Sequence, residues 1–174
     1  MFILKILFSL LIIGLGIVIL KHATITQSFI RFLRSNTANI LLFGSASLWF
    51  LYHIYHLHPA NFGEYRTHLL ILFSIIIVCA FFYVKDFLSV RGLAVLLLLF
   101  MNTLLQATYM HFFLSNLFLN ALAYITILLA LTLGTIPYIF RDFLLWLPTK
   151  PKLTKPLSYL SIFIGALLAL SSFF

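Results

Sequence analysis

Charged residues are scarce in this sequence, and acidic residues are the scarcest of them. Only 8% of the 174 residues are charged and only three are Asp or Glu, whereas about a quarter of the residues in a soluble domain carry a charge. Hydrophobic residues make up 64% of the chain, and its mean hydropathy is +1.18. So little charge cannot cover a domain with a hydrated surface, so the composition indicates an integral membrane protein.

Several chemical motifs are missing as well. The single cysteine, Cys79, excludes an internal disulfide and a Cys-rich metal site. There is no Gly-rich phosphate loop, no nucleophile elbow and no HExxH zinc helix. The net charge of +8 does not imply nucleic acid, because membrane proteins concentrate Lys and Arg in loops that face anionic lipid. We therefore expect a non-catalytic protein whose first partner is the lipid bilayer.

Long apolar runs separated by short polar connections are what the sequence has instead. A helix needs about 20 apolar residues to cross the hydrocarbon of a bilayer, and these runs do not alternate as the strands of a membrane barrel do. The sequence therefore predicts an all-α integral membrane protein, a single domain made of a bundle of about six transmembrane helices. The six predicted spans are 2–20, 40–57, 67–84, 93–110, 117–140 and 157–174.

The basic residues alternate between the connections. Nine of the eleven Lys and Arg residues lie in connections 21–39, 85–92 and 141–156, and the other two are Lys5 and Arg66. Positive charge marks the cytoplasmic side, so these three connections are expected inside and both termini outside. A bacterial plasma (inner) membrane is the default location.

Two cytoplasmic connections carry the residues expected to contact lipid headgroups. The first includes Arg31 and Arg34 on a segment whose apolar residues have helical spacing, which predicts a helix lying in the interface. The fifth includes Lys150, Lys152 and Lys155 among three prolines, which predict an extended loop before residue 157. Near the inner end of the fifth span, Gly134 and Pro137 indicate a kink.

Histidine is concentrated on the predicted outer side. The outer groups that resemble a ligand set are His53, His56, His58, His68, His111 and Glu64. Imidazoles and a carboxylate suit haem iron or a transition metal, so a metal or haem site is one interpretation. Histidine is also common beside Tyr and Trp at a membrane interface, so an aromatic belt with structural hydrogen bonds is the other. A pH-sensing or proton-relay role is a third.

Amide side chains interrupt two of the spans. The polar stripe consists of Asn102, Gln106, Tyr109, Asn116 and Asn120. Because an unpaired amide is costly in hydrocarbon, the stripe is predicted to face the interior of the bundle. It serves either hydrogen bonding between helices or a path for a polar substrate or water.

Small residues at helical spacing predict where helices approach closely. The candidates are Gly44 and Ser47 on the second span and Ser161, Gly165 and Ala169 on the last. Short connections and small-residue faces favour an accessory subunit or assembly factor of a larger membrane complex, with other membrane proteins as partners. A haem- or metal-binding protein and a small transporter or channel are the alternatives.

The charge pattern makes the orientation testable. In a Cys79→Ser background, Thr149→Cys should be protected from a membrane-impermeant maleimide in intact cells, and Ser171→Cys should react. Labelling of the cysteine at position 149 before the cells are opened would reverse the predicted orientation.

Overall fold

The computed structural model describes residues 2–21, 35–58, 62–84, 87–109, 114–146 and 151–171. These residues are almost entirely helical, and they include six helices long and apolar enough to cross a membrane. The first span is α1 (Phe2–Leu20), and the second joins α3 (Asn36–Ala38), η1 (Asn39–Phe43) and α4 (Gly44–Tyr55). The others are α5 (Arg66–Tyr83), α6 (Leu88–Thr108), α7 (Leu114–Thr135) and α9 (Pro151–Ser171). The prediction of an all-α membrane protein with six spans is confirmed.

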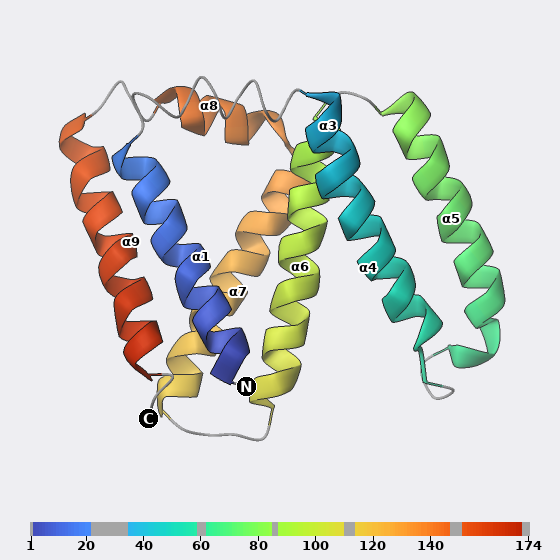
Figure 1. Ribbon diagram of the computed structural model, residues 1–174, viewed down its shortest axis with the longest axis horizontal. Coiled ribbons are helices and arrows are strands. Elements are labelled where there is room, and N and C mark those ends of the chain that lie inside the picture. Colours follow the sequence, from blue (N-terminus) through green and yellow to red (C-terminus); the bar gives the residue numbers. More distant parts are fainter. Residues whose placement is uncertain are drawn as a thin grey trace.

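The spans stand side by side, and the start of α1 and the end of α9 lie at the same face of the bundle (Figure 1). The short helix η3 (Gly63–Tyr65), between α4 and α5, lies at that same face. A further helix, α8 (Tyr138–Trp146), lies across the opposite face. Successive spans run in opposite directions between the two faces, as the alternation of Lys and Arg between the connections predicts (Figure 1). Which of the two faces is cytoplasmic stays a prediction from the charges.

The prediction for the fifth span was wrong at its inner end. The span was expected to continue to Phe140, but α7 ends at Thr135 and α8 begins at Tyr138. Proline cannot donate the backbone hydrogen bond that would continue a helix, and Pro137 lies in the turn between the two. The predicted kink is therefore a complete change of direction. Leu144 of α8 is buried against Val90 of α6 and holds α8 on the bundle.

The expected extended loop before the last span was also wrong where the structure describes it. Helix α9 begins at Pro151 rather than at residue 157 and contains Pro156. Proline is well tolerated in the first turn of a helix, where the missing N–H has no partner to lose. Pro156 lies just beyond that turn, and its ring faces outward. Thr154 and Ser158, on the other face of the helix, are fully buried.

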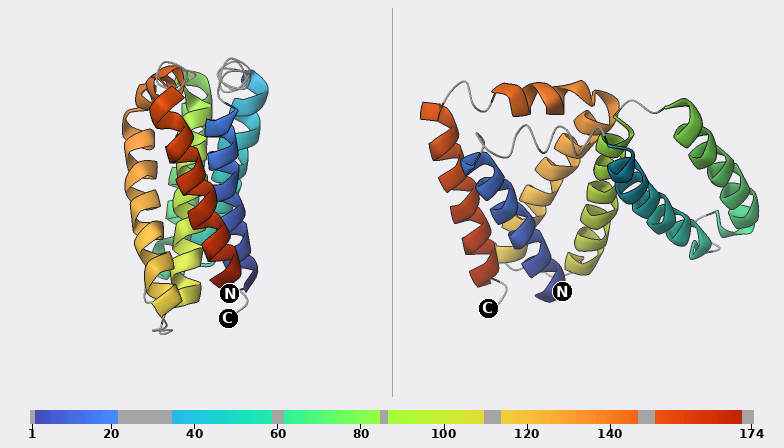
Figure 2. Two further views of the ribbon diagram at one scale, coloured as in Figure 1. Left: turned by 90° about the vertical axis from the view of Figure 1, so that its left-hand side faces the viewer. Right: turned by 45° about the horizontal axis from the view of Figure 1, so that its top comes forward.

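The first and last spans make the most extensive contact between helices in the described part of the chain. They run antiparallel, and the views agree that α1 and α9 lie side by side (Figures 1 and 2). A Cβ added at Gly16 would lie 2.7 Å from Ile162 Cγ1 and 3.0 Å from the carbonyl oxygen of Ser158. A Cβ added at Gly165 would lie 3.0 Å from the carbonyl oxygen of Ser9. Only glycine allows the two backbones to approach so closely.

This contact is reciprocal because the two helices share a sequence pattern. Both contain Ser-x-x-x-Ile-x-x-Gly, at 9–16 in α1 and at 158–165 in α9. In each helix the Ile side chain lies over the glycine of the other. The pattern therefore joins two segments that are far apart in the chain.

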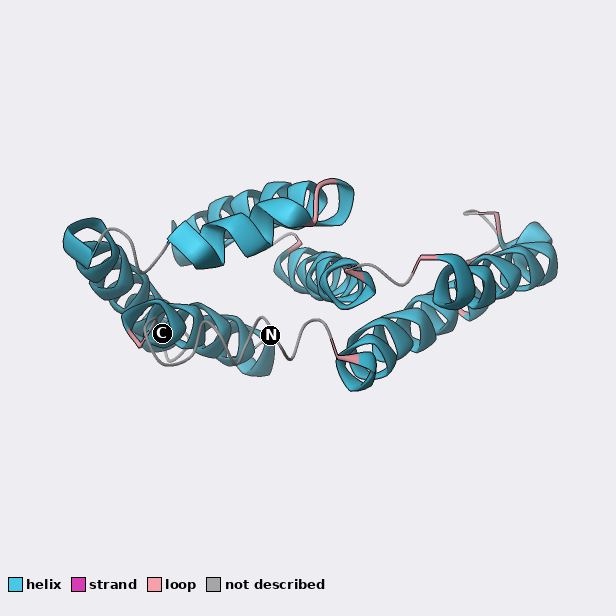
Figure 3. Ribbon diagram, turned by 90° about the horizontal axis from the view of Figure 1, so that it is seen from above, coloured by secondary structure: helices cyan, strands magenta, loops and turns pink. Residues whose placement is uncertain are grey.

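Two apolar clusters hold the remaining helices. Near the face with the termini, Phe8 of α1, Leu104 of α6, Leu119 of α7 and Leu168 of α9 are all buried together. At the other face, η1 contacts α6 so closely that a Cβ on Gly92 would lie 2.6 Å from the Cα of Phe43. Seen from above, α4 and α5 extend away from the other four spans as a separate hairpin (Figure 3).

A side chain from η1 completes the start of α6. Phe87, which precedes α6, has a φ of 57° and offers no side-chain cap. The Oδ1 atom of Asn39 instead accepts a hydrogen bond from the backbone N–H of Ser89 at 3.0 Å. Inside a bilayer there is no water to bond a free N–H at a helix end, so the protein must supply the acceptor. The bond from Ser89 to Asn39 does this and fixes η1 beside α6.

Glycine substitutions test the contact between α1 and α9. Gly16→Ala should lower the free energy of unfolding by about 1–3 kcal/mol, because the added methyl overlaps the α9 backbone. Gly14→Ala is the matched control, since a Cβ there meets nothing within 4 Å. Thermal unfolding in detergent measures both variants. Equal stabilities would contradict the packing described above.

Candidate functional site

The polar groups of α6 and α7 divide into a covered set and an exposed set. The covered set lies between the two helices, where Thr108 Oγ1 donates to Asn120 Oδ1 at 2.7 Å. Asn116 is buried with a relative exposure of 1%, and Asn120 is half-buried. These two amides lie where the sequence placed them, in the interior of the bundle.

The other part of the predicted stripe does not face the interior. Asn102, Gln106 and Tyr109 are exposed on the outside of α6, which corrects the expectation that the whole stripe is buried. The reason is the spacing of the buried residues, because Met101, Leu104 and Thr108 form the face of α6 that packs in the core. Because a helix turns about 100° per residue, Asn102 and Tyr109 point about 100° away from the core residues that precede them. Gln106, two residues from both Leu104 and Thr108, points about 160° away from each.

This exposure is unusual for the helix that carries it. Among the 21 residues of α6, Asn102 and Gln106 are the only two that are exposed. They bond weakly to each other, with Gln106 Nε2 donating to Asn102 Oδ1 at 3.4 Å. Each amide group has two N–H donors, so most of their donors are left over. Asn102 lies about 9 Å along the helix from Thr108, which is within the span.

Hydroxyl side chains on the outer surface behave differently. Ser45 on α4 donates to the carbonyl oxygen of Leu42, and Thr132 on α7 donates to that of Leu129. Such bonds let Ser and Thr satisfy themselves on their own helix, so their exposure to lipid costs little. Asn102 and Gln106 have no comparable backbone bond among the described residues.

The structure separates the histidines instead of gathering them. His56 turns back on its own helix, where Nδ1 lies 3.0 Å from the carbonyl oxygen of Tyr52 and the two rings lie 4.2 Å apart. His53 contacts the ring of Trp49, while His58 and His68 are exposed. Within the described residues, no three His, Cys, Asp or Glu side chains could hold one metal ion. Glu64 is among these residues, whereas His111 lies outside the described part of the chain.

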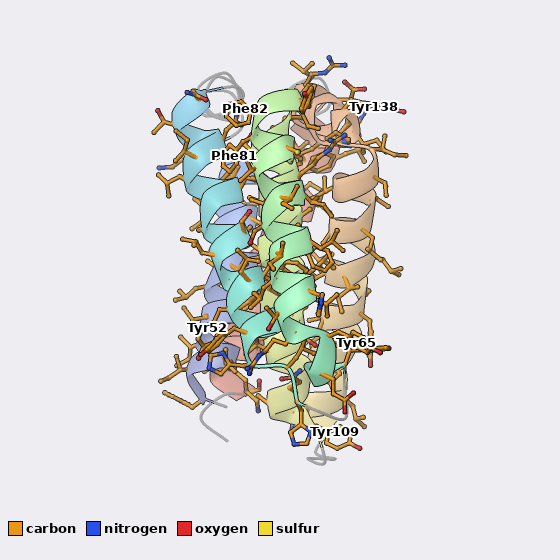
Figure 4. The ribbon with its side chains drawn as sticks, turned by 90° about the vertical axis from the view of Figure 1, so that its right-hand side faces the viewer. Tyr52, Tyr65, Phe81, Phe82, Tyr109 and Tyr138 are labelled. Carbon is orange, nitrogen blue, oxygen red and sulfur yellow. The ribbon has the colours of Figure 1, made fainter. Side chains whose placement is uncertain are left out.

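Aromatic side chains mark both ends of the spans. Figure 4 shows Tyr52, Tyr65 and Tyr109 toward one end, and Phe81, Phe82 and Tyr138 toward the other. Tyr prefers the headgroup level of a bilayer, so Tyr52, Tyr65 and Tyr109 at one end and Tyr138 at the other lie where spans that cross a membrane would need them.

Arg66 has a structural role that the sequence did not indicate. Its Nη1 atom donates to the carbonyl oxygen of Tyr55 at 3.3 Å, and its guanidinium lies 5.2 Å from the centre of the Tyr55 ring. It therefore caps the end of α4 from the start of α5. Two edge-to-face pairs, Phe43–Phe81 and Phe50–Phe73, hold the same hairpin together.

The predicted small-residue positions have different surroundings. A Cβ at Gly44 would meet nothing within 4 Å, while Ser47 is 8% exposed and donates to the carbonyl oxygen of Phe43. Gly165 lies against α1, whereas Ser161 and Ala169 are half-buried beside that contact. Prediction missed Gly16 and Gly92, although the shared pattern of α1 and α9 is a signal that would have found Gly16.

Most of the basic residues expected at lipid headgroups lie outside the described part of the chain. This applies to Arg31, Arg34 and Lys150. Lys152 lies in α9, but its side chain is not described. Lys155 is exposed near the start of α9, on the same face of the bundle as α8.

No protein-family profile, curated protein or solved structure matches this chain. Its six-span architecture and the chemistry of its surfaces are therefore the basis for function.

Two threonines on one helix test the covered polar contact. Thr108→Val should lower the free energy of unfolding by about 0.6–1.7 kcal/mol, the measured range for hydrogen bonds between membrane helices. Thr103→Val is the control, because its hydroxyl donates to the carbonyl oxygen of Leu99 within α6. A double-mutant cycle with Asn120→Leu isolates the contact. Zero coupling between positions 108 and 120 would contradict it.

Proposed function

We propose that this chain is a non-catalytic subunit or assembly factor of a larger membrane complex. The observation that carries the proposal is the exposed amide pair of α6, Asn102 and Gln106. An unpaired amide in hydrocarbon costs free energy, so a face of this kind favours contact with another protein. The central helix of the bundle would then carry its docking surface.

The hairpin of α4 and α5 supports the same proposal. None of the residues of α5 is buried, and the helix packs against α4, η3 and, through Phe81, against Phe43 of η1. Most residues of this helix are exposed and remain available to lipid or to a neighbouring protein. The exposed amides of α6 and the unburied helix α5 are both surfaces that a neighbouring membrane protein could contact.

The mass of the assembly in native membranes tests this function. Solubilised in a mild detergent, the protein should migrate in a complex heavier than its own 20.0 kDa. Asn102→Leu combined with Gln106→Leu should shift it to lower mass, because the variant removes the hydrogen bonds to the partner. Its melting temperature should be unchanged or higher, since leucine suits lipid better.

Ser45→Ala is the control for this experiment, because Ser45 is also exposed but bonds to its own helix. It should leave the complex intact. A wild-type protein that is monomeric in native membranes would overturn the proposed function. So would a double variant that retains the full mass.

A further inference from the structure

Lys5 is a buried cation near the start of α1. It is only 8% exposed, and its ammonium group makes no hydrogen bond or ion pair within the residues that the structure describes. A lysine is almost never buried to this degree without a partner, because burial takes the charge out of water. Arg66, the other basic residue on this side, caps α4. Lys5 therefore needs an acceptor from outside the described fold.

The register of α1 places Lys5 beside the apolar cluster of the four-helix part of the bundle. Lys5 precedes Phe8 by three residues, so the two side chains share one side of α1. Phe8 is fully buried in one cluster with Leu104 of α6, Leu119 of α7 and Leu168 of α9. Lys5 lies about 4.5 Å from Phe8 along the helix, toward the face with the start of α1. It therefore lies just beyond the end of this cluster.

Polar residues of α6 and α7 lie beyond the same end of the cluster. Asn116 precedes Leu119 by three residues in α7, and Thr108 follows Leu104 by four in α6. Each is thus about one turn from the cluster toward the same face as Lys5. Asn116 is 1% exposed and Thr108 is 3% exposed. Three helices therefore each contribute a buried polar side chain at this end of the bundle.

Asn120 adds donors to the group. Its Oδ1 atom accepts from Thr108 Oγ1 at 2.7 Å, so its NH2 group still has both N–H donors for another acceptor. Asn116 and Asn120 are four residues apart and are therefore neighbours on one side of α7. We call Lys5, Thr108, Asn116 and Asn120 the lysine–amide cluster.

The surroundings of the lysine–amide cluster favour an anion. Of the acidic residues in the described ranges, Glu64 lies on η3 of the far hairpin and Asp142 lies on α8 at the opposite face (Figure 1). Helices α1 and α7 both begin at the face of the cluster. The start of a helix carries a partial positive charge, so both helices add to the charge of Lys5.

We infer that the lysine–amide cluster binds a phosphate group. Ammonium and amide N–H groups can donate to several oxygens of one phosphate at once, and bonds to a charged acceptor are the strong ones. Thr108 ends α6, and Asn116 lies in the first turn of α7. The cluster is therefore near the ends of its helices, where a phosphate reaches it without crossing the hydrocarbon. The group belongs either to a lipid headgroup or to a soluble phosphate compound.

This inference does not depend on the proposed function. The lysine–amide cluster is inside the four-helix part of the bundle, whereas the amide pair of the proposed docking surface is on the outside of α6.

Thermal unfolding in a neutral sugar detergent tests the site with two probes. One is sodium phosphate, compared with sodium chloride of the same ionic strength. The other is phosphatidylglycerol, compared with a galactosyl diacylglycerol that has the same acyl chains and no phosphate. A ligand that binds only the folded protein raises its melting temperature, so at least one phosphate probe should do so beyond its control.

A lysine substitution assigns the effect to the site. Lys5→Met should weaken the apparent affinity for the active probe about tenfold or more, the loss expected for a hydrogen bond to a charged group. Without the probe this variant should be at least as stable as the wild type, because methionine buries no charge. Lys21→Met is the matched control, since Lys21 is exposed just after the other end of α1. It should respond as the wild type does.

A carboxylate built into the cluster should replace the phosphate. In Asn116→Asp the new charge can pair with Lys5, so this variant should melt at a higher temperature than the wild type when no phosphate is present. It should also lose the response to the active probe. Adding Lys5→Met to Asn116→Asp should remove the gain in melting temperature.

The outcomes distinguish the two sources of phosphate. A response to phosphatidylglycerol alone identifies a lipid headgroup, whereas a response to sodium phosphate identifies a soluble compound. A wild-type protein that responds to neither probe would overturn the inference. So would a response that Lys5→Met or Asn116→Asp retains in full, or one that Lys21→Met loses equally.

Discussion

The absence of water from the hydrocarbon of a bilayer governs this structure. Every backbone N–H and C=O inside the membrane needs a partner, so the spans are helical and their ends require caps. The constraint explains why Asn39 reaches across to the first turn of α6 and why Arg66 caps α4. It also explains why exposed Ser and Thr side chains bond to their own helices. The amides of α6 depart from this rule, and that departure carries the functional argument.

Packing in this bundle combines apolar clusters with close contact between helix backbones. Lipid is as apolar as leucine, so burying leucine gains little in a membrane, whereas close backbone contact gains dispersion energy over a long interface. Gly16, Gly92 and Gly165 each lie against another helix. A Cβ at Gly14 or Gly44 would meet nothing within 4 Å. Gly14 nevertheless belongs to the same helix as Gly16, and Gly44 to the same span as η1. A glycine contributes to packing here only where its Cα faces a neighbouring helix.

The hydropathy of the chain was enough to predict the number of spans and their approximate limits, because hydrocarbon thickness fixes the length of an apolar helix. The end of α7 and the start of α9 were harder, since proline is compatible both with a turn, as at Pro137, and with a first helical turn, as at Pro151. The polarity of the amides predicted that they face the interior of the bundle, but it could not determine the side of the helix on which each one lies. Asn116 turned inward and Asn102 outward because their helices present different sides to the core, and only tertiary packing determines that.

The contact between α1 and α9 has a consequence for biosynthesis. A ribosome delivers α1 to the membrane before α9, yet the surface around Gly16 is covered only when residues about 140 positions later arrive. Until then lipid covers the surface of α1 around Gly16. Bringing α1 and α9 together closes a long loop, which carries an entropic cost. The interface is formed from two spans that already cross the membrane, so its assembly is a lateral search in two dimensions. The contact between α1 and α9 therefore forms only after all the spans between them have been inserted.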